Sequence, residues 1–242
     1  MGFLNSYEDA HRANAYAQLK FSGTYYLAYR DLPDIISKYV NGRKSLDFGC
    51  GTGRSTRFLK KLGFNATGVD ISKTMIHQAK KIDPAGDYQI IKDEKFDQFS
   101  DETFDLVFSI FTFDNIPTNI EKERNLQEIF RVLRDEGVFI NLVSSPEIYV
   151  NEWISFSTKD FPENKQANSG DIVKIIITDI GDKRPVEDIF FSPEDYRKLF
   201  INTGFKIENI YKPLAEESNQ NKWINETKIP PWNIYILKKF QN

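Results

Sequence analysis

The chain has 242 residues, of which 40% are hydrophobic and 28% are charged, and its formal net charge is −3. This length and composition predict one α/β domain with an insertion, or at most two small domains, and they exclude a disordered chain. Tight nucleic-acid binding needs a basic surplus that neutralises phosphates, so the acidic balance argues against a nucleic-acid partner.

The cysteine and histidine content indicates the cellular compartment and argues against a metal site. The single cysteine, Cys50, cannot form an internal disulfide, so we expect a reducing, cytoplasmic location. One cysteine and two histidines are too few for a zinc-type cluster, and we expect no metal. No apolar run approaches the roughly 20 residues of a membrane span, so we expect no membrane partner. For the oligomeric state we expect a monomer or a homodimer.

Helices and short apolar strands alternate along the first part of the chain. Two helical stretches come first, at 10–20 and 25–40, and Pro33 stands where a new helix can begin. The predicted strands are 45–48, 65–70, 88–91, 104–111 and 138–143, and the helices between them are 55–62, 72–82 and 119–133. Strands that alternate with helices of this length imply a parallel sheet with right-handed crossovers.

The regular alternation stops after residue 143. Residues 144–170 are polar, aromatic and irregular, and two β-rich runs follow at 172–179 and 186–191. Ser192-Pro193-Glu194 then opens a helix, because a hydroxyl cap, a proline and an acid suit the first helical turn. Strands at 205–211 and 233–238 would close the sheet. We interpret 144–191 as an insertion over the carboxyl ends of the strands, where open α/β sheets bind ligands.

A glycine cluster joins the first strand to its helix and points to a nucleoside-containing ligand. Gly49, Gly51 and Gly53 allow a sharp turn and a close approach of the ligand to the backbone. Asp70 ends the next strand, where a carboxylate can accept hydrogen bonds from ribose hydroxyls. The dinucleotide fingerprint Gly-x-Gly-x-x-Gly is incomplete, because Arg54 or Thr56 occupies its sixth position.

Several segments in the same order and at matching spacing resemble the class I S-adenosylmethionine-dependent methyltransferases. They are 46–53, 68–72, Met75, 92–94, 104–107 and 131–137. The resemblance is close over about 44–144 and extends by pattern alone over 192–238. It implies S-adenosyl-L-methionine as the cofactor. Each feature taken singly has an ordinary reading as a tight turn, a helix cap, a solvated residue or core filler, and only their joint occurrence is specific.

The resemblance also implies which residues hold the cofactor. The glycines would flank its amino-acid end, Asp47 and the Ser109 carbonyl would help to hold its ammonium group, and Asp70 would take the ribose. The residues expected around the adenine and its ribose are Ile71, Met75, Asp93 and Glu94. In many relatives an N-terminal segment folds over the cofactor, and here Tyr16, Tyr25 and Arg30 would contact it, with Arg30 reaching the carboxylate. The equal alternative is an amphipathic helix whose tyrosines pack on the sheet edge.

Candidate acceptor residues follow the fourth strand and fill the insertion. Asp114 and Asn115 would orient or deprotonate an acceptor, although an Asx turn ahead of Pro117 explains them slightly better. Some relatives place a histidine base in this region, and this chain has none there. From the insertion we expect four acceptor residues, although burial in a second small core is the plainer role for any one of the aromatic residues among them. These four are Tyr149, Glu152, Trp153 and Phe156.

The predicted architecture is a Rossmann-like seven-stranded, mostly parallel sheet with helices on both faces. An N-terminal helical lid (1–43) precedes the cofactor-binding core (44–143), and a β-rich cap (144–191) precedes the last part of the sheet (192–242). The predicted activity is methyl transfer to an oxygen or nitrogen atom of a small molecule, mainly by positioning and desolvation. The alternatives are a nicotinamide-dependent oxidoreductase and a non-catalytic cofactor-binding protein.

Overall fold

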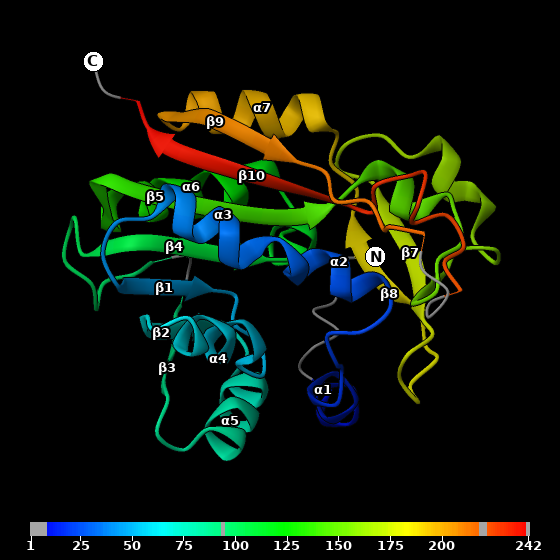
Figure 1. The fold of residues 1–242 in the computed structure, drawn as a ribbon, viewed down its shortest axis with the longest axis horizontal. Coiled ribbons are helices and arrows are strands. Elements are labelled where there is room, and N and C mark those ends of the chain that lie inside the picture. The colour runs from blue at the N-terminus through cyan, green and yellow to red at the C-terminus, as the bar shows by residue number, and fades with distance from the viewer. Residues whose placement is uncertain (1–8, 93–94, 218–221, 241–242) are drawn as a thin grey trace.

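A computed structural model describes residues 9–92, 95–217 and 222–240. A seven-stranded sheet with helices on both faces forms its centre, and a three-stranded sheet lies at one end (Figure 1). The large sheet contains β1 (Lys44–Phe48), β2 (Asn65–Asp70), β3 (Asp87–Ile90), β4 (Phe104–Ile110), β5 (Leu133–Ser144), β9 (Phe205–Tyr211) and β10 (Trp232–Lys239). The α-helices are α1 (Ala10–Ala17), α2 (Thr24–Arg30), α3 (Leu32–Tyr39), α4 (Arg54–Lys61), α5 (Lys73–Ile82), α6 (Asn119–Val132) and α7 (Pro193–Asn202).

The strand order of the large sheet is β3-β2-β1-β4-β5-β10-β9. Every pair from β3 to β5 is parallel, whereas β10 runs antiparallel to both of its neighbours. The chain moves outward from β1 to β3 and then returns to place β4 on the other side of β1. A crevice opens outside the carboxyl ends of strands at such a switch point, which makes this edge the place for a ligand.

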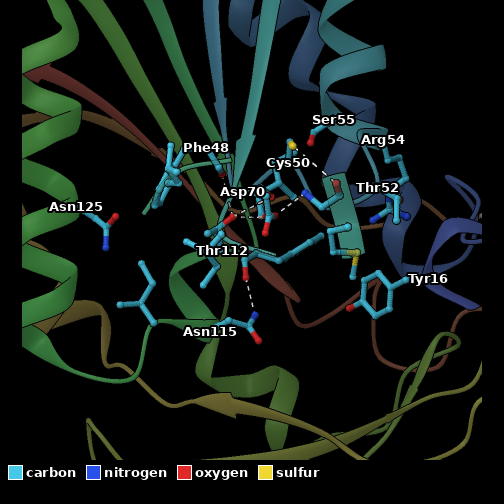
Figure 2. A pocket seen from close by; sticks show the side chains of 18 of the residues that line it. Tyr16, Phe48, Cys50, Thr52, Arg54, Ser55, Asp70, Thr112, Asn115 and Asn125 are labelled. Atoms are coloured by element: carbon cyan, nitrogen blue, oxygen red, sulfur yellow. Dashed lines mark hydrogen bonds between the residues drawn. The ribbon is translucent and has the colours of Figure 1, made fainter. Parts of the chain in front are cut away.

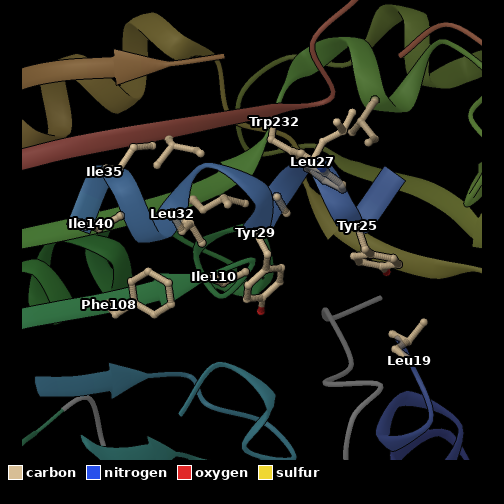
Figure 3. Packing of buried hydrophobic residues seen from close by; sticks show 14 of the residues in the cluster. Leu19, Tyr25, Leu27, Tyr29, Leu32, Ile35, Phe108, Ile110, Ile140 and Trp232 are labelled. Carbon is tan, nitrogen blue, oxygen red and sulfur yellow. The ribbon is translucent and has the colours of Figure 1, made fainter. Parts of the chain in front are cut away.

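Alternation along the central strands assigns each side chain to one of two cores. In β4, Leu106 and Phe108 face the cluster built with α2, α3 and α4, whereas Val107 faces the cluster built with α6 and α7. Figure 3 shows the first cluster, with Leu32 and Ile35 of α3 lying over the sheet. Because both faces are covered, β4 is apolar at nearly every position and buried throughout, as the sequence analysis expected.

The predicted N-terminal helical segment has two different parts. The stretch 25–40 breaks at Asp31 into α2 and α3, with Pro33 in the first turn of α3, where a missing amide hydrogen is harmless. The apolar faces of these two helices belong to the main core. Only α1 lies apart from the sheet, beside α5, and it ends at Ala17 rather than near residue 20 (Figure 1).

The segment after β5 forms a β-rich cap, as predicted. Its antiparallel sheet has the order β6-β7-β8, with β6 (Phe156–Ser157), β7 (Ile172–Ile177) and β8 (Val186–Ile189). The same segment contains the 3₁₀ turns η3 (Pro146–Tyr149) and η4 (Pro162–Gln166), whereas the turn η2 (Phe113–Asn115) follows β4.

One buried side chain joins the cap to both ends of the chain. The carboxylate of Glu226 accepts hydrogen bonds from the Thr24 hydroxyl of α2 and from the backbone of Ile154 in the cap. Trp232 adds a bond from its indole to the Thr24 carbonyl. Helix α2 is therefore held on two sides by hydrogen bonds, in addition to its apolar packing.

Local signals explain most element boundaries. Helix α6 begins at a capping box between Thr118 and Glu121, and α7 begins at the Ser192 cap with Pro193 in its first turn. Strand β5 starts at Leu133 instead of residue 138, because Leu133 pairs with Phe104 of β4 ahead of the regular ladder. Within the described ranges no helix is long and apolar enough to cross a membrane.

Candidate active site

A cavity of about 610 Å³ opens where the sequence analysis placed the ligand, at the carboxyl ends of β1, β2 and β4. Its wall includes the loop after β1, the end of β2, the start of α5, the segment after β4 and part of α6. Figure 2 shows Asp70 near its middle, with Asn125 of α6 on one side and Arg54 of α4 on the other. A volume of this size suits a small-molecule ligand, since such pockets usually measure about 300–1,000 Å³.

The glycine loop leaves backbone exposed on this cavity. At Gly49 and Gly53 a Cβ atom would collide with Thr112 and Tyr88 of the protein itself. At Gly51, where φ is +53°, a Cβ atom would meet nothing within 4 Å. Gly51 lines the cavity, so the missing side chain keeps open the space beside the backbone there. The first and third glycines are thus required by packing within the protein, and the middle one leaves room for a ligand.

Asp70 organises this loop and faces the ligand space. Its Oδ2 accepts the Gly51 amide hydrogen at 2.8 Å, and its Oδ1 accepts the Ser72 amide hydrogen at 2.8 Å. Desolvation raises the pKa of the half-buried carboxyl, although these two bonds oppose the shift. A carboxylate has about four acceptor positions, so each oxygen can still accept a bond from a ligand hydroxyl.

Asp47 lies beneath the loop and is completely buried. The hydroxyls of Ser55 and Thr56 at the start of α4 each donate to its Oδ2 at 2.6 Å. Its Oδ1 has no hydrogen-bond partner among the described residues. Burial raises the pKa of this carboxyl to about 6, and the hydroxyl bonds oppose that rise. A buried carboxylate with an unmatched oxygen attracts positive charge from the loop side.

Arg54, the residue directly after the third glycine, carries positive charge into the cavity wall. Its guanidinium carbon lies 5.4, 5.1 and 5.6 Å from the ring centroids of Phe21, Tyr25 and Tyr29. Such cation–π contacts hold the group in place. Its Nη1 is buried and has no hydrogen-bond partner among the described residues. The guanidinium therefore keeps donor capacity for an anionic ligand group.

About half of the residues predicted for the cofactor line this cavity. Those that do are Tyr16, Gly49, Gly51, Asp70, Ile71 and Met75. The Ile71 side chain is 59% exposed, and Met75 is buried below it in the first turn of α5. Gly53 and Asp47 support the wall without lining it. Asp93 and Glu94 lie outside the described residues.

Three other predicted cofactor residues do not line this cavity. Arg30 pairs with the adjacent Asp31, at 2.6 Å from Nε to Oδ1, and donates to the Leu214 carbonyl. Ser109 is fully buried in β4, away from the cavity lining. Tyr25 packs among aromatic rings and lines a smaller neighbouring cavity, and its burial places the pKa of its hydroxyl well above the usual value.

The pair predicted for catalysis is divided between two cavities. Asn115 lines the large cavity and the small one beside it, and its amide donates to the Phe111 carbonyl at 2.9 Å. Asp114 lines the small cavity alone, and its Oδ2 accepts the Ser144 amide hydrogen at 2.9 Å. Burial raises the pKa of the Asp114 carboxyl, while the Ser144 bond and the nearby Lys122 charge lower it.

Three of the four residues expected from the insertion build the cap itself. The Tyr149 hydroxyl donates to Asp188, and the Trp153 indole donates to the Ile148 carbonyl. Glu152 caps the following turn, accepting bonds from Ser157 and Thr158. Phe156 lines the small cavity. Tyr149 and Trp153 thus have buried partners within the insertion, as the alternative of a second small core expected, whereas Glu152 caps a turn.

Sequence reasoning missed four charged residues that line the cavities, namely Arg54, Lys92, Glu121 and Asp188. Arg54 could have been found from its place directly after the glycine motif. Asp188 stands in the β-rich run 186–191, where an acid among apolar residues is the available signal, but its neighbours are distant in sequence.

Comparison with known proteins agrees with this geometry. The sequence family described as a methyltransferase domain matches residues 46–141. An uncharacterized protein of Methanocaldococcus jannaschii is 29% identical over 218 residues, covering 86% of this chain and 81% of that protein. An uncharacterized methyltransferase of Bacillus licheniformis is 33% identical over 138 residues, covering 55% of this chain and 60% of that protein.

The fold has close solved counterparts. The crystal structure of an S-adenosylmethionine-dependent methyltransferase from Clostridium acetobutylicum superposes with a TM-score of 0.64. The two chains are 16% identical, and the match covers 96% of this chain and 98% of that one. At this identity the likeness concerns the fold.

Fold and cavity together define an enzyme of the Rossmann-like class that binds a nucleoside-containing cofactor. Residues 46–141 match the methyltransferase-domain family, and together with the fold this match supports an S-adenosylmethionine-dependent methyltransferase whose cofactor is S-adenosyl-L-methionine. These comparisons favour neither the nicotinamide-dependent oxidoreductase nor the non-catalytic binding protein.

Proposed function

We propose that the protein transfers the methyl group to an oxygen or nitrogen atom of a small-molecule acceptor. The observation that carries this proposal is the size of the cavity, about 610 Å³, which lies in the range of small-molecule sites. Tyr16 of α1 contributes to its wall, and the smaller cavity beside it is lined by β7 and β8 of the cap. A concave pocket of this volume suits a metabolite better than a folded macromolecule.

The residues around the cavity fit the cofactor. Gly51 leaves space for a close backbone approach, Asp70 can accept from the ribose hydroxyls, and Ile71 with Met75 offers apolar surface to the adenine. Asp47 would balance the positive charge of the amino-acid end from below the loop. When bound, the cofactor supplies a methyl group that its sulfonium already activates.

We further propose that Arg54 binds the carboxylate of the cofactor's amino-acid end. The sequence analysis expected Arg30 in this role, but the Arg30 side chain pairs with Asp31 and Leu214. Arg54 lines the cavity beside the glycine loop and has a buried donor without a partner among the described residues. A guanidinium held by three rings binds a carboxylate with little loss of side-chain entropy.

The chain's own contribution to the reaction would be positioning and exclusion of water. Asn115 lies between the two cavities, where its carbonyl oxygen can orient an acceptor. Tyr16 and the cap cover the same region, so a bound acceptor would exchange bulk water for fixed protein groups. In this proposal residues 1–43 supply a lid through α1 alone, and residues 144–191 supply the acceptor side. A cytoplasmic location and a monomeric or homodimeric state remain predictions.

Transfer of labelled methyl groups tests the nature of the acceptor. The enzyme is incubated with methyl-labelled S-adenosylmethionine and a cell extract that has been separated by dialysis into small and large molecules. Label should appear in a small molecule of the dialysable fraction that chromatography separates from S-adenosylmethionine. Label confined to protein or RNA would contradict the small-molecule proposal. The Asp70→Ala variant serves as the matched inactive control, and Asp160→Ala, which changes an exposed acid of the cap, as the active one.

A further inference from the structure

A second cavity, of about 30 Å³, lies directly beside the cofactor cavity. Tyr16, Phe111 and Asn115 line both spaces, so these three residues mark their common boundary. A space of this size can hold a water-sized group, since about 10–15 Å³ of such volume is enough for one water molecule. It therefore has room for a single small polar group of an acceptor whose remaining atoms lie in the large cavity.

Two buried carboxyl groups face this small cavity from different parts of the fold. Asp114 comes from the turn after β4 and is 4% exposed, whereas Asp188 comes from β8 of the cap and is 8% exposed. Tyr149 donates to Asp188 Oδ2 at 3.1 Å, and the Ser144 amide donates to Asp114 Oδ2. The Tyr196 hydroxyl also donates to Asp114 Oδ1, so the hydrogen-bond partners of both acids among the described residues are neutral donors.

One buried cation stands near the two acids. Lys122 of α6 is fully buried, and its ammonium donates to the carbonyls of Phe113 and Ile116 at 2.6 and 2.5 Å. Burial lowers the pKa of Lys122, while the Asp114 charge raises it. Burial and the Asp114 charge raise the pKa of Asp188, and the Tyr149 bond and Lys122 oppose that rise. Among the described residues, the buried cluster therefore contains two acidic side chains, Asp114 and Asp188, and one basic side chain, Lys122.

The other ionisable neighbours do not change this excess of acidic over basic groups. Tyr25, Tyr149 and Tyr196 are buried phenols, whose raised pKa values keep them neutral near pH 7. Tyr16 is the remaining phenol in the lining. Arg54 lies on the far side of Tyr25 and lines only the large cavity.

Aromatic rings form the rest of the small cavity's wall. The Tyr25 ring centroid lies 5.0 Å from that of Phe156 and 6.1 Å from that of Trp232, and Phe111 lies 4.7 Å from Trp232. Aromatic faces attract a cation that lies within about 6 Å of the ring centroid. Carboxylates beside an aromatic wall recognise an ammonium group better than a neutral hydroxyl of equal size.

We propose that the small cavity binds the amino group of an amine acceptor, held as an ammonium ion by Asp188 and Asp114 within the ring of aromatic side chains. This inference rests on the proposed small-molecule function and narrows its acceptor to an amine. A bound ammonium completes the charge balance of the buried cluster, with two acids and two bases.

The same arrangement accounts for the proton that an amine must lose before its nitrogen can be methylated. The N–H bond of the ammonium breaks with its electron pair left on nitrogen, and the proton moves to Asp188, which becomes a carboxylic acid. The total charge of the cluster stays constant during this transfer. A carboxyl group with a raised pKa suits such a proton acceptor, because its pKa then lies nearer the working pH.

Calorimetry with benzylamine and benzyl alcohol tests the assignment, with S-adenosylhomocysteine present in saturating amount. The wild-type protein should bind the amine at least about tenfold more tightly than the alcohol, which corresponds to about 1.4 kcal/mol. Asp188→Asn should remove this preference. Glu187→Gln, which changes the adjacent residue of the same strand, should keep it, because Glu187 pairs instead with Lys174.

Proton release provides a second readout that needs no variant. Because Asp188 must ionise to pair with an ammonium, benzylamine binding near pH 7 should release about one proton, visible in buffers of different ionisation enthalpy. Equal or tighter binding of the alcohol, or an unchanged preference in a folded Asp188→Asn protein, overturns the amine site. Those results with S-adenosylhomocysteine still bound refute only this inference, whereas failure to bind S-adenosylhomocysteine refutes the cofactor site itself.

Discussion

The two halves of the active-site region are built in opposite ways. On the cofactor side, residues close in sequence meet at the ends of neighbouring strands, as Gly51 and Asp70 do through a backbone hydrogen bond. On the cap side, Asp114 and Asp188 come from a turn after β4 and from a small antiparallel sheet. The first half exposes its backbone to the ligand, while the second buries side chains against each other.

A sequence motif can therefore reveal the residues of the cofactor side, but it cannot reveal those of the cap side. A nucleoside site at a switch point depends on a short loop and one acid, which have standard spacing. An acceptor site built by packing depends on which aromatic and acidic side chains happen to face an open space. Substitutions that affect one half and spare the other test whether the division is real.

Asp70→Ala should have the largest effect, because the carboxylate both holds the loop and faces the ligand space. Loss of two charge-assisted hydrogen bonds to a ligand would weaken S-adenosylhomocysteine binding by about 3 kcal/mol, a little over a hundredfold. Isothermal titration calorimetry measures this change. Asp160→Ala is the control and should bind normally. Unchanged affinity of the Asp70→Ala protein would reject the assignment of this residue.

Asp47→Asn should produce a stability difference that depends on pH. The pKa of the folded-state carboxyl is raised from 3.8 to about 6, so its contribution to stability is complete at low pH and is lost as pH rises through about 6. The asparagine of the variant does not titrate, so this loss of stability does not occur in the variant. Its free energy of unfolding relative to wild type should therefore increase by roughly 2 kcal/mol between pH 4 and pH 7. Urea titrations at several pH values without cofactor measure it, and a constant difference would contradict the shift.

Gly51→Ala and Gly63→Ala form a matched pair for the exposed backbone. Both glycines have positive φ, at +53° and +86°, and at both a Cβ atom would meet nothing within 4 Å. Each variant should lose about 1 kcal/mol of stability through backbone strain. Only Gly51→Ala should also bind S-adenosylhomocysteine less tightly, by about tenfold, since Gly51 alone lines the cavity. Equal binding by the two variants would remove the proposed close approach at Gly51.

Glu152→Gln should have the smallest effect and should act on stability alone. Its carboxylate accepts bonds from Ser157 and Thr158 within the cap, so the variant should lose about 1 kcal/mol in thermal unfolding. Cofactor affinity and the KM for the acceptor should stay constant. Glu147→Gln, an exposed change in the same region, is the control. A raised KM with normal stability would instead support the acceptor role expected from the sequence.

The fold was predictable in most respects, and the misses have local causes. The order of strands and helices followed from hydrophobic period and cap residues, whereas the antiparallel direction of β10 was not predicted. The break at Asp31 was anticipated by Pro33, but the pattern did not reveal that α2 and α3 would pack in the main core. Strand β5 extends back to Leu133 through one irregular pair with Phe104, which periodicity alone does not encode.

The site was predictable only where its residues are neighbours in the chain. Gly51, Asp70, Ile71 and Met75 follow from the motif and line the cavity. Arg30 was chosen over Arg54 because a lid was expected to supply the cation, and its pairing with Asp31 depends on where α2 ends. Glu152 looked like a polar acceptor contact, but a turn five residues later uses it as a cap.

The sequence by itself determined the α/β class, the glycine loop and the acid of the nucleoside site. These features depend on residues that are close together in the chain, and their spacing within parallel strand–helix units allows few arrangements. Only the tertiary structure decided which charges are buried, how the insertion uses its aromatic side chains, and that Asp188 faces Asp114 across a small cavity. Those outcomes depend on packing between segments far apart in the chain, where desolvation and hydrogen bonding act only after the fold has formed.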